Sequence, residues 1–487
     1  MSDENTLPVE SIDQDPIEAP EPEKPRKFDS AITEGPLSKA VWKIAWPAVL
    51  TNIFSGLQGW VDQILVGNLV GYQANAAIGI AFQIFLFVIV FVSSVFIGMS
   101  VLVARFAGAN EPEKVNRTVY QGFLTATFMA LGILAPIGYF AAPYLLSLVS
   151  HDADVIAEAL PFLRIMFTCS IGMMMYFMLS GSLRSAGDAR TPMVLGITMN
   201  VLNLILSIVL IRGLGPIPSF GTVGAAMGTC IASGLVGAYS LYKLYNGSWV
   251  VSFPKSSYKP DWRIIRQLFK FGLPAGFQGI AMNAGGLVMA GFMGSLAQGK
   301  ATQAVYAVCY SQLFLLVTWS SNALMGASAA VAGQNMGAGK PDRAVTAVRT
   351  SASFGLAGAI VVGLFFFFIP EQLLAIFGMT EPEVVKIGVE LLRVLSVSGL
   401  FISMALAFTG GLQGTGDTKS PLYISIVSQV LIPVGICLIV QNIVGLQPIH
   451  IWLAILAGHF TRFLLSFIRF NQQRWRDIKV EIHSTAA

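Results

Sequence analysis

Asp62 is the residue of this chain whose type and position most clearly require a chemical role. Sixteen carboxylates follow position 36, and all the others lie in predicted loops or within about two turns of a predicted helix end. Asp62 instead lies fifteen residues after Pro47 in an apolar stretch, roughly 22 Å along a helix. In a membrane, a carboxylate at that depth costs several kcal/mol unless it is neutralised or faces water. We interpret Asp62 as functional; the alternative, that it caps a polar cluster, stays open.

Polar residues on two later apolar stretches could share a site with this acid. Asn203 and Ser207 are spaced i and i+4, and Asn200 lies one turn before Asn203. Thr229 follows a run of small residues, which permits close helix packing. Carboxylate, amide and hydroxyl oxygens together suit a proton relay or a sodium ion at Asp62. Because such polar residues also bond across membrane helices for packing alone, a structural role stays open for each.

A second group of residues could line a substrate cavity. Met and aromatic side chains make adaptable surfaces for varied apolar ligands, and polar side chains among them orient the ligand. The candidates are Gln58, Met175, Tyr176, Gln278, Met282, Asn283 and Tyr310. Ordinary membrane core is the alternative for each. Pro47 is a candidate hinge, because proline is where long helices bend.

Composition identifies an integral membrane protein. The chain is 54% hydrophobic and only 11% charged, with a mean hydropathy of +0.68, whereas soluble proteins carry about 25% charged residues. Its four cysteines and four histidines have no metal-binding or disulfide spacing. These features predict a lipid bilayer as partner, exclude nucleic acid as a partner, and argue against a metal-dependent membrane enzyme.

Apolar runs predict twelve spanning helices and no strands. They lie near 44–69, 79–104, 119–142, 160–182, 192–212, 222–245, 267–294, 302–332, 348–369, 388–411, 421–444 and 449–470. The fold class is therefore an all-α integral membrane protein.

An internal duplication divides these helices into two sixes. GSLRSAGDARTPM at 181–193 returns as GGLQGTGDTKSPL at 410–422, an offset of 229. The same offset carries Gly108 onto Gly337. Six helices per repeat predict two lobes related by a pseudo-twofold axis along the membrane normal. In each repeated loop, Thr191 or Ser420 can cap the next helix, and a structural capping role is also expected of Asp188 and Asp417, with gating between the lobes as the alternative. The first helices of the repeats align at an offset of 227, from Pro47 to Pro274. At that offset Asp62 falls opposite Met289 and so has no acidic counterpart.

Charge places the termini. With the N-terminus inside, 25 of the 30 Lys and Arg residues fall on the inner side, as the positive-inside rule requires. This predicts cytoplasmic termini. The expected location is a bacterial inner membrane. The predicted segments are an acidic disordered tail (1–36), a first lobe (37–246), a cytoplasmic linker (247–266), a second lobe (267–472) and a C-terminal tail (473–487).

The chain resembles the MATE (multidrug and toxic compound extrusion) family. The resemblance rests on Pro47, Val61-Asp62 and Gly67, on the loops at 108–114 and 337–343, on both Gly-Asp loops, and on the regions of Asn203, Gly224 and Ile451-Trp452. It covers about residues 38–475. Ser207 stands where many members have a second acid, and there is no glutamate near Met282. This pattern is closer to the DinF-like branch and tilts the expectation toward protons.

The resemblance implies two lobes around a V-shaped cavity and antiport of organic cations or drugs against protons or sodium. Asp62 would be the coupling carboxylate, with Asn203 and Thr229 beside it. No cofactor is expected besides the coupling ion, and the expected oligomeric state is a monomer.

Three alternatives to drug export stay open. An exporter of a specific metabolite, such as a peptide or flavin, would have the same pattern. A flippase for a lipid-linked or anionic substrate would need basic residues in the cavity, and the inward positions are expected to be neutral apart from Asp62. A membrane hydrolase would need a nucleophile–base pair, for which Asp62 has no partner in the sequence, so no enzymatic activity is expected.

Overall fold

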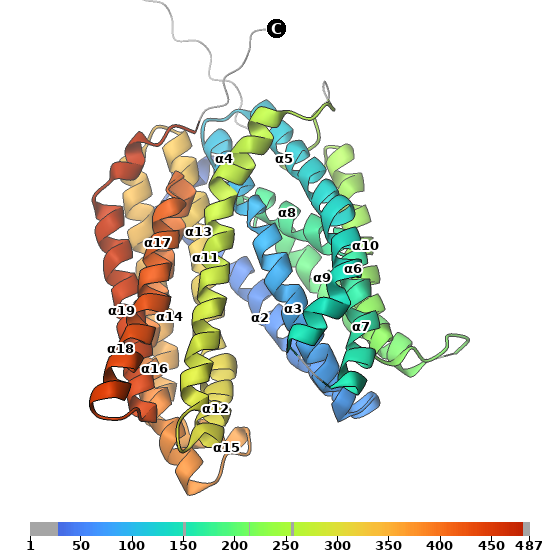
Figure 1. Cartoon of the computed structure of the whole chain (residues 1–487). Helices are drawn as coiled ribbons and strands as arrows, with labels where there is room; N and C mark the ends of the chain where they lie inside the picture. The colour runs from blue at the N-terminus through green and yellow to red at the C-terminus, as the bar shows by residue number, and fades with distance from the viewer. Residues whose placement is uncertain (1–27, 150–151, 214, 255–257, 481–487) are drawn as a thin grey trace, which may run out of the picture.

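The computed structural model describes residues 28–149, 152–213, 215–254 and 258–480. Within these ranges the side chains of eight helical residues are left undescribed: Trp60, Asp62, Gln63, Ile64, Tyr72, Gln73, Asn75 and Ala76. Apart from short connections, the described chain is helical, and the helices form two bundles that converge at one end of the molecule and diverge toward the other (Figure 1).

The first lobe contains six spans after a short helix, α1. Its elements are α1 (Ser30–Thr33), α2 (Leu37–Leu69), α3 (Tyr72–Ser93), α4 (Val95–Gly108), α5 (Pro112–Thr127), η1 (Phe128–Leu134), α6 (Ala135–Val149), α7 (Ala153–Thr168), α8 (Ile171–Ser185), α9 (Arg190–Arg212) and α10 (Gly221–Tyr245). The pairs α3–α4 and α7–α8 and the run α5–η1–α6 each make one span, and α7–α8 is bent by 50°.

The second lobe repeats this plan. Its elements are α11 (Trp262–Gly294), α12 (Gly299–Val308), η2 (Cys309–Leu313), α13 (Leu315–Gly337), α14 (Pro341–Phe368), α15 (Pro370–Ile376), α16 (Pro382–Thr415), α17 (Lys419–Ile426), η3 (Val427–Leu431), α18 (Ile432–Ile443), α19 (Pro448–Asn471) and η4 (Arg474–Asp477). Here α17–η3–α18 is one span, and α13 is a span that follows α12 and η2. The segments η2 and η3 are π-helical.

Twelve spans result, six in each lobe, which confirms the predicted fold class. Nine helices of the described chain are long and apolar enough to cross a membrane, and the bent α7–α8 pair makes a tenth. The first helices of the lobes, α2 and α11, complete the set. Each is 33 residues long with a proline inside, Pro47 or Pro274.

The repeated Gly-Asp loops have the same conformation in both lobes. Gly187 and Gly416 have φ angles of +101° and +98°, a left-handed backbone that glycine adopts without a steric penalty. Asp188 accepts bonds from the Thr191 amide (3.0 Å) and hydroxyl (2.5 Å). Asp417 accepts the same two bonds from Ser420, at 3.2 and 2.8 Å. The aspartates therefore cap the next helix, which confirms the structural role expected of them. Thr191 and Ser420 lie inside α9 and α17, so the expected capping by these two residues is wrong.

The two lobes meet at the end of the molecule that holds the α10–α11 connection and residues 472–480, here called the connector end (Figure 1). Gly98 of α4 packs on the backbone of α11 at Leu268, and a Cβ on Gly98 would lie 2.1 Å from the Leu268 carbonyl oxygen. The absence of side chains at such positions is what lets the helices approach.

Several segment boundaries differ from those predicted. In the predicted acidic tail, residues 1–27 lie outside the described residues, but α1 is ordered: Ile32 is fully buried and its carbonyl accepts a bond from Asn335 of α13. Five residues of the predicted linker belong to α11, which begins at Trp262. In the predicted C-terminal tail, Trp475 is fully buried and stacks on Phe470 at 5.2 Å.

Candidate ion-coupling site

One face of α2 carries the residues of the candidate site. Ser55, Gln58 and Asp62 are spaced three and four residues apart, so they lie on the same side of the helix. The backbone of Asp62 belongs to α2, and its side chain lies outside the described part of the structure. The site is therefore built from the polar groups that lie one turn before Asp62 in α2, on its connector side.

Gln58 begins a chain of hydrogen bonds that joins three helices of the first lobe. Its Nε2 donates to Oδ1 of Asn203 on α9 at 2.5 Å. Asn203 Nδ2 in turn donates to Oγ1 of Thr229 on α10 at 2.7 Å. Asn203 is only 2% exposed, so both ends of its amide are committed to this network. The structure joins Asn203 and Thr229 by this hydrogen bond, and the prediction that both share a site with Asp62 stays a prediction.

The other two predicted coupling residues lie on the same face of α9. Asn200 Nδ2 donates to the Ser55 hydroxyl of α2 at 3.2 Å. Ser207 is buried where Gly228 of α10 packs on it, and a Cβ on Gly228 would lie 2.5 Å from its hydroxyl oxygen. Ser55 was not singled out from the sequence, although its spacing of three and seven residues from Gln58 and Asp62 is a sufficient signal.

The predicted cavity residues divide into two groups. Met282 and Asn283 of α11 are exposed. The others are buried or half-buried inside a lobe. Met175 and Tyr176 are 4% and 8% exposed, and Gln278 is 6% exposed with its amide bonded to the Ser425 hydroxyl at 2.9 Å. Helical spacing identified polar positions but not which of them face away from their own lobe.

The second lobe contains a buried charge that the sequence interpretation placed on the inner side. Arg462 of α19 is 2% exposed and lies fourteen residues into a 24-residue helix. The expectation that Asp62 is the one charged inward position is therefore wrong. The positive-inside count treats Arg462 in the same way as Arg469, which lies in the last turn of α19. A count of charges cannot tell a buried arginine from one at a helix end.

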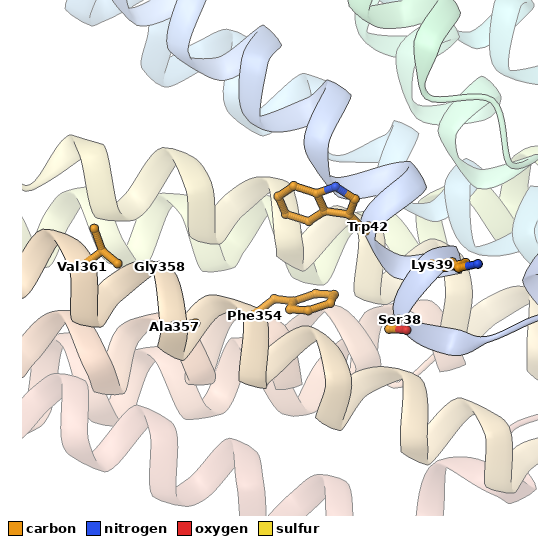
Figure 2. Close-up of a pocket in the computed structure, with 7 residues that line it drawn as sticks. All are labelled: Ser38, Lys39, Trp42, Phe354, Ala357, Gly358 and Val361. Carbon is orange, nitrogen blue, oxygen red and sulfur yellow. The ribbon is translucent and has the colours of Figure 1, made fainter.

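A groove on the outside of the bundle is separate from these sites. It has a volume of about 620 Å³ and lies between α2 and α14, where Trp42 meets Phe354 edge to face at 5.8 Å (Figure 2). Its lining is apolar apart from Ser38 and Lys39. Trp42 is twenty residues before Asp62, about 30 Å along the helix, so the groove is not part of the polar network.

Metal ligands of the usual kinds do not gather in the described part of the chain. No three His, Cys, Asp or Glu side chains there lie close enough to hold a metal ion. The described oxygens near Asp62 belong to amide and hydroxyl groups, which suit a proton-bearing water or a monovalent cation better than a transition metal.

Two six-helix lobes with equivalent loops and one polar network beside an intramembrane acid define a two-lobed membrane transporter. A model of the MatE family matches residues 47–209 and 274–439, one block in each lobe. Because these blocks cover more than half of the chain, the protein belongs to the MATE family.

Individual relatives agree with this assignment. The chain is 25% identical over 445 residues to the probable multidrug resistance protein NorM of Thermotoga maritima, covering 90% of this chain and 93% of the relative. It is 24% identical over 450 residues to the multidrug export protein MepA of Staphylococcus haemolyticus, covering 90% and 94%. A solved outward-facing MATE transporter superposes with a TM-score of 0.84 at 20% identity, covering 91% of this chain and 97% of that one.

Proposed function

We propose that the protein exports organic cations or drugs across the bacterial inner membrane by antiport against protons or sodium. The observation that carries the proposal is the Gln58–Asn203–Thr229 network, which begins one turn before Asp62 on α2. The relatives named above as multidrug resistance and export proteins support the same substrate class. The transport cycle needs no enzymatic step, and the unit of transport is a monomer.

The mechanism is exchange at one carboxylate. Ionised Asp62 attracts a cationic, amphipathic substrate. When Asp62 takes up a proton or sodium ion at the outer side, the substrate loses its counter-charge and leaves. Each net charge that moves through the membrane potential supplies ~2.3 kcal/mol per 100 mV, enough to bias export when ion and substrate exchange strictly.

The network gives Asp62 a fixed polar environment. Asn203 bonds to both Gln58 and Thr229, so α2, α9 and α10 move together when the acid changes charge. With Ser207 in place of a second acid, one carboxylate serves this lobe, which favours the proton as coupling ion. The orientation has the connector end and both termini in the cytoplasm, where the positive-inside rule puts the basic loops.

The test is efflux of a fluorescent organic cation from bacterial cells that lack their own pumps. A proton gradient and a sodium gradient are imposed separately on cells with the wild-type chain, Asp62→Asn or Glu390→Gln. Glu390 lies in the outer part of α16 and is the matched control. We expect the wild type and Glu390→Gln to export dye under one of the two gradients. We expect the efflux rate of Asp62→Asn to be at least about tenfold lower, which corresponds to a rise of ~1.4 kcal/mol in the barrier to transport.

Equal efflux by the wild type and Asp62→Asn would show that Asp62 is structural and that the mechanism is wrong. Dye movement without either gradient would instead indicate a passive channel.

A further inference from the structure

Arg462 lies deep in the second lobe. It is fourteen residues from Pro448 in α19, about 21 Å along the helix, and only 2% of its side chain is exposed. A charged side chain at this depth is expensive unless it is paired or serves a ligand pathway. Its partners therefore decide what it does.

The guanidinium of Arg462 has almost no acceptors. Among the described residues, no carboxylate forms an ion pair with it, and its Nε has no hydrogen-bond partner. Its Nη1 approaches only the Met282 sulfur, at 3.9 Å. A thioether is a weak acceptor, whereas a guanidinium offers five donors in a planar fork that matches a carboxylate. Within the described ranges, no carboxylate therefore neutralises this charge.

A column of flat aromatic rings reaches α19 one turn before this arginine. Tyr306 stacks on Tyr310 at 4.8 Å and 10°, and Trp452 lies parallel to Tyr306 at 6.3 Å. The column continues through His459, one turn before Arg462 on α19, at 6.4 Å from Tyr310. Tyr310 belongs to the π-helical segment η2, a kind of distortion found frequently at functional sites.

Met282 gives the site an entrance. It contacts Arg462 and is itself 38% exposed, so one unbranched and flexible side chain separates the guanidinium from the surface of α11. Exposed residues continue along α11 through Asn283, Leu287 and Val288.

We propose that Arg462 binds the carboxylate of a flat aromatic substrate, with Tyr306 and Tyr310 beside the aromatic ring and Met282 as the movable cover. This inference deepens the proposed function and rests on it: Asp62 of the first lobe receives the cationic group, and Arg462 of the second lobe receives the anionic group. The favoured substrate class is then an aromatic compound that carries both charges.

Binding to the purified full-length protein in lipid nanodiscs tests this proposal without any gradient. The probe is benzoate, and benzylamine is the cation of similar shape. We expect benzoate to raise the melting temperature of the wild type and to bind Arg462→Gln at least about tenfold more weakly, equivalent to ~1.4 kcal/mol. Arg462→Lys keeps the charge without the fork and should bind with intermediate affinity. Arg393→Gln is the control, because Arg393 is exposed beside Phe367 in the same lobe.

The melting temperature without ligand separates this role from a structural one. Removal of an unpaired buried charge should leave the melting temperature of Arg462→Gln unchanged or raise it. A clear drop would mean that Arg462 holds the lobe together and would overturn the proposal, as would equal benzoate binding by the wild type and Arg462→Gln. If chloride competed for the site as strongly as benzoate, the proposed recognition of an aromatic ring would be overturned. Because no transport is measured, these outcomes are independent of the Asp62 efflux test.

Discussion

Gly108 and Gly337 occupy equivalent positions on two sides of one contact between the lobes. A Cβ on Gly108 would lie 1.9 Å from the Gln334 carbonyl oxygen of α13, and one on Gly337 would lie 2.0 Å from the Arg105 carbonyl oxygen of α4. The two glycines are separated by 229 residues, the offset of the duplication. The pseudo-twofold axis therefore passes near this contact, and the connector end closes this tightly only because both residues lack a side chain.

A methyl group at this contact should keep the connector end from closing. Overpacking costs about 1–3 kcal/mol, so Gly108→Ala should lower the population of the closed state by about tenfold. Spin labels at Glu113 and Thr346, exposed residues of α5 and α14, would report a longer distance between the lobes. Gly286→Ala is the control, because a Cβ there meets no atom within 4 Å. An unchanged distance in Gly108→Ala would show that the helices adjust without opening.

The amide of Asn203 should matter for coupling as well as for packing. Asn203→Leu removes the two hydrogen bonds that the Asn203 amide makes to Gln58 and Thr229, and each lost hydrogen bond costs about 1 kcal/mol. We expect the coupling-ion concentration for half-maximal efflux to rise by about tenfold. Asn442→Leu, at an exposed position of α18, should leave it unchanged. A loss of thermal stability with normal ion dependence would show that the network only packs the helices.

The duplicated aspartates should differ in their contribution to stability. Asp188 caps one helix, so Asp188→Ala should cost about 1 kcal/mol. Asp417 makes the same cap and also pairs with Arg469 of α19 at 2.8 Å while only 5% exposed. Asp417→Ala should therefore cost at least about twice as much.

Melting temperatures in one detergent compare these variants directly. A double-mutant cycle with Arg469→Gln isolates the ion pair. Equal losses in both aspartate variants would mean that the pair adds nothing to the cap.

The sequence predicts what is local or repeated, and the structure adds what depends on the facing helix. The 229-residue offset predicted the matching turns at Gly187 and Gly416, and the spacing on α9 placed Asn203 and Ser207 on one face. Gln278 has an equally regular spacing, but its face turns toward Ser425 of its own lobe. The positive-inside count assigned Arg462 to the inner side with the loop charges, although it lies nine residues before the end of α19. Only the packing of α19 on α11 reveals that its nearest acceptor is a thioether.

Trp319 should act as the barrier between Asp62 and the connector end. A Cβ on Gly56 would lie 1.9 Å from the Trp319 ring, and Asn52 Nδ2 donates to the Trp319 carbonyl at 2.9 Å. Gly56 is six residues before Asp62, about 9 Å along α2. The indole therefore closes the space between α2 and α13 on the connector side of the acid.

Trp319→Ala should uncouple ion movement from substrate transport, because removal of the indole leaves a path for water between Asp62 and the connector end. In proteoliposomes with an imposed proton gradient and no substrate, we expect the gradient to decay several-fold faster than with the wild type, since a hydrated path no longer requires substrate exchange. Trp262→Ala, which removes an indole that is 75% exposed at the start of α11, is the matched control and should not leak. If the proton gradient decayed no faster in vesicles with Trp319→Ala than with the wild type, the barrier to protons would lie elsewhere, at the glycine contact of α4 and α13.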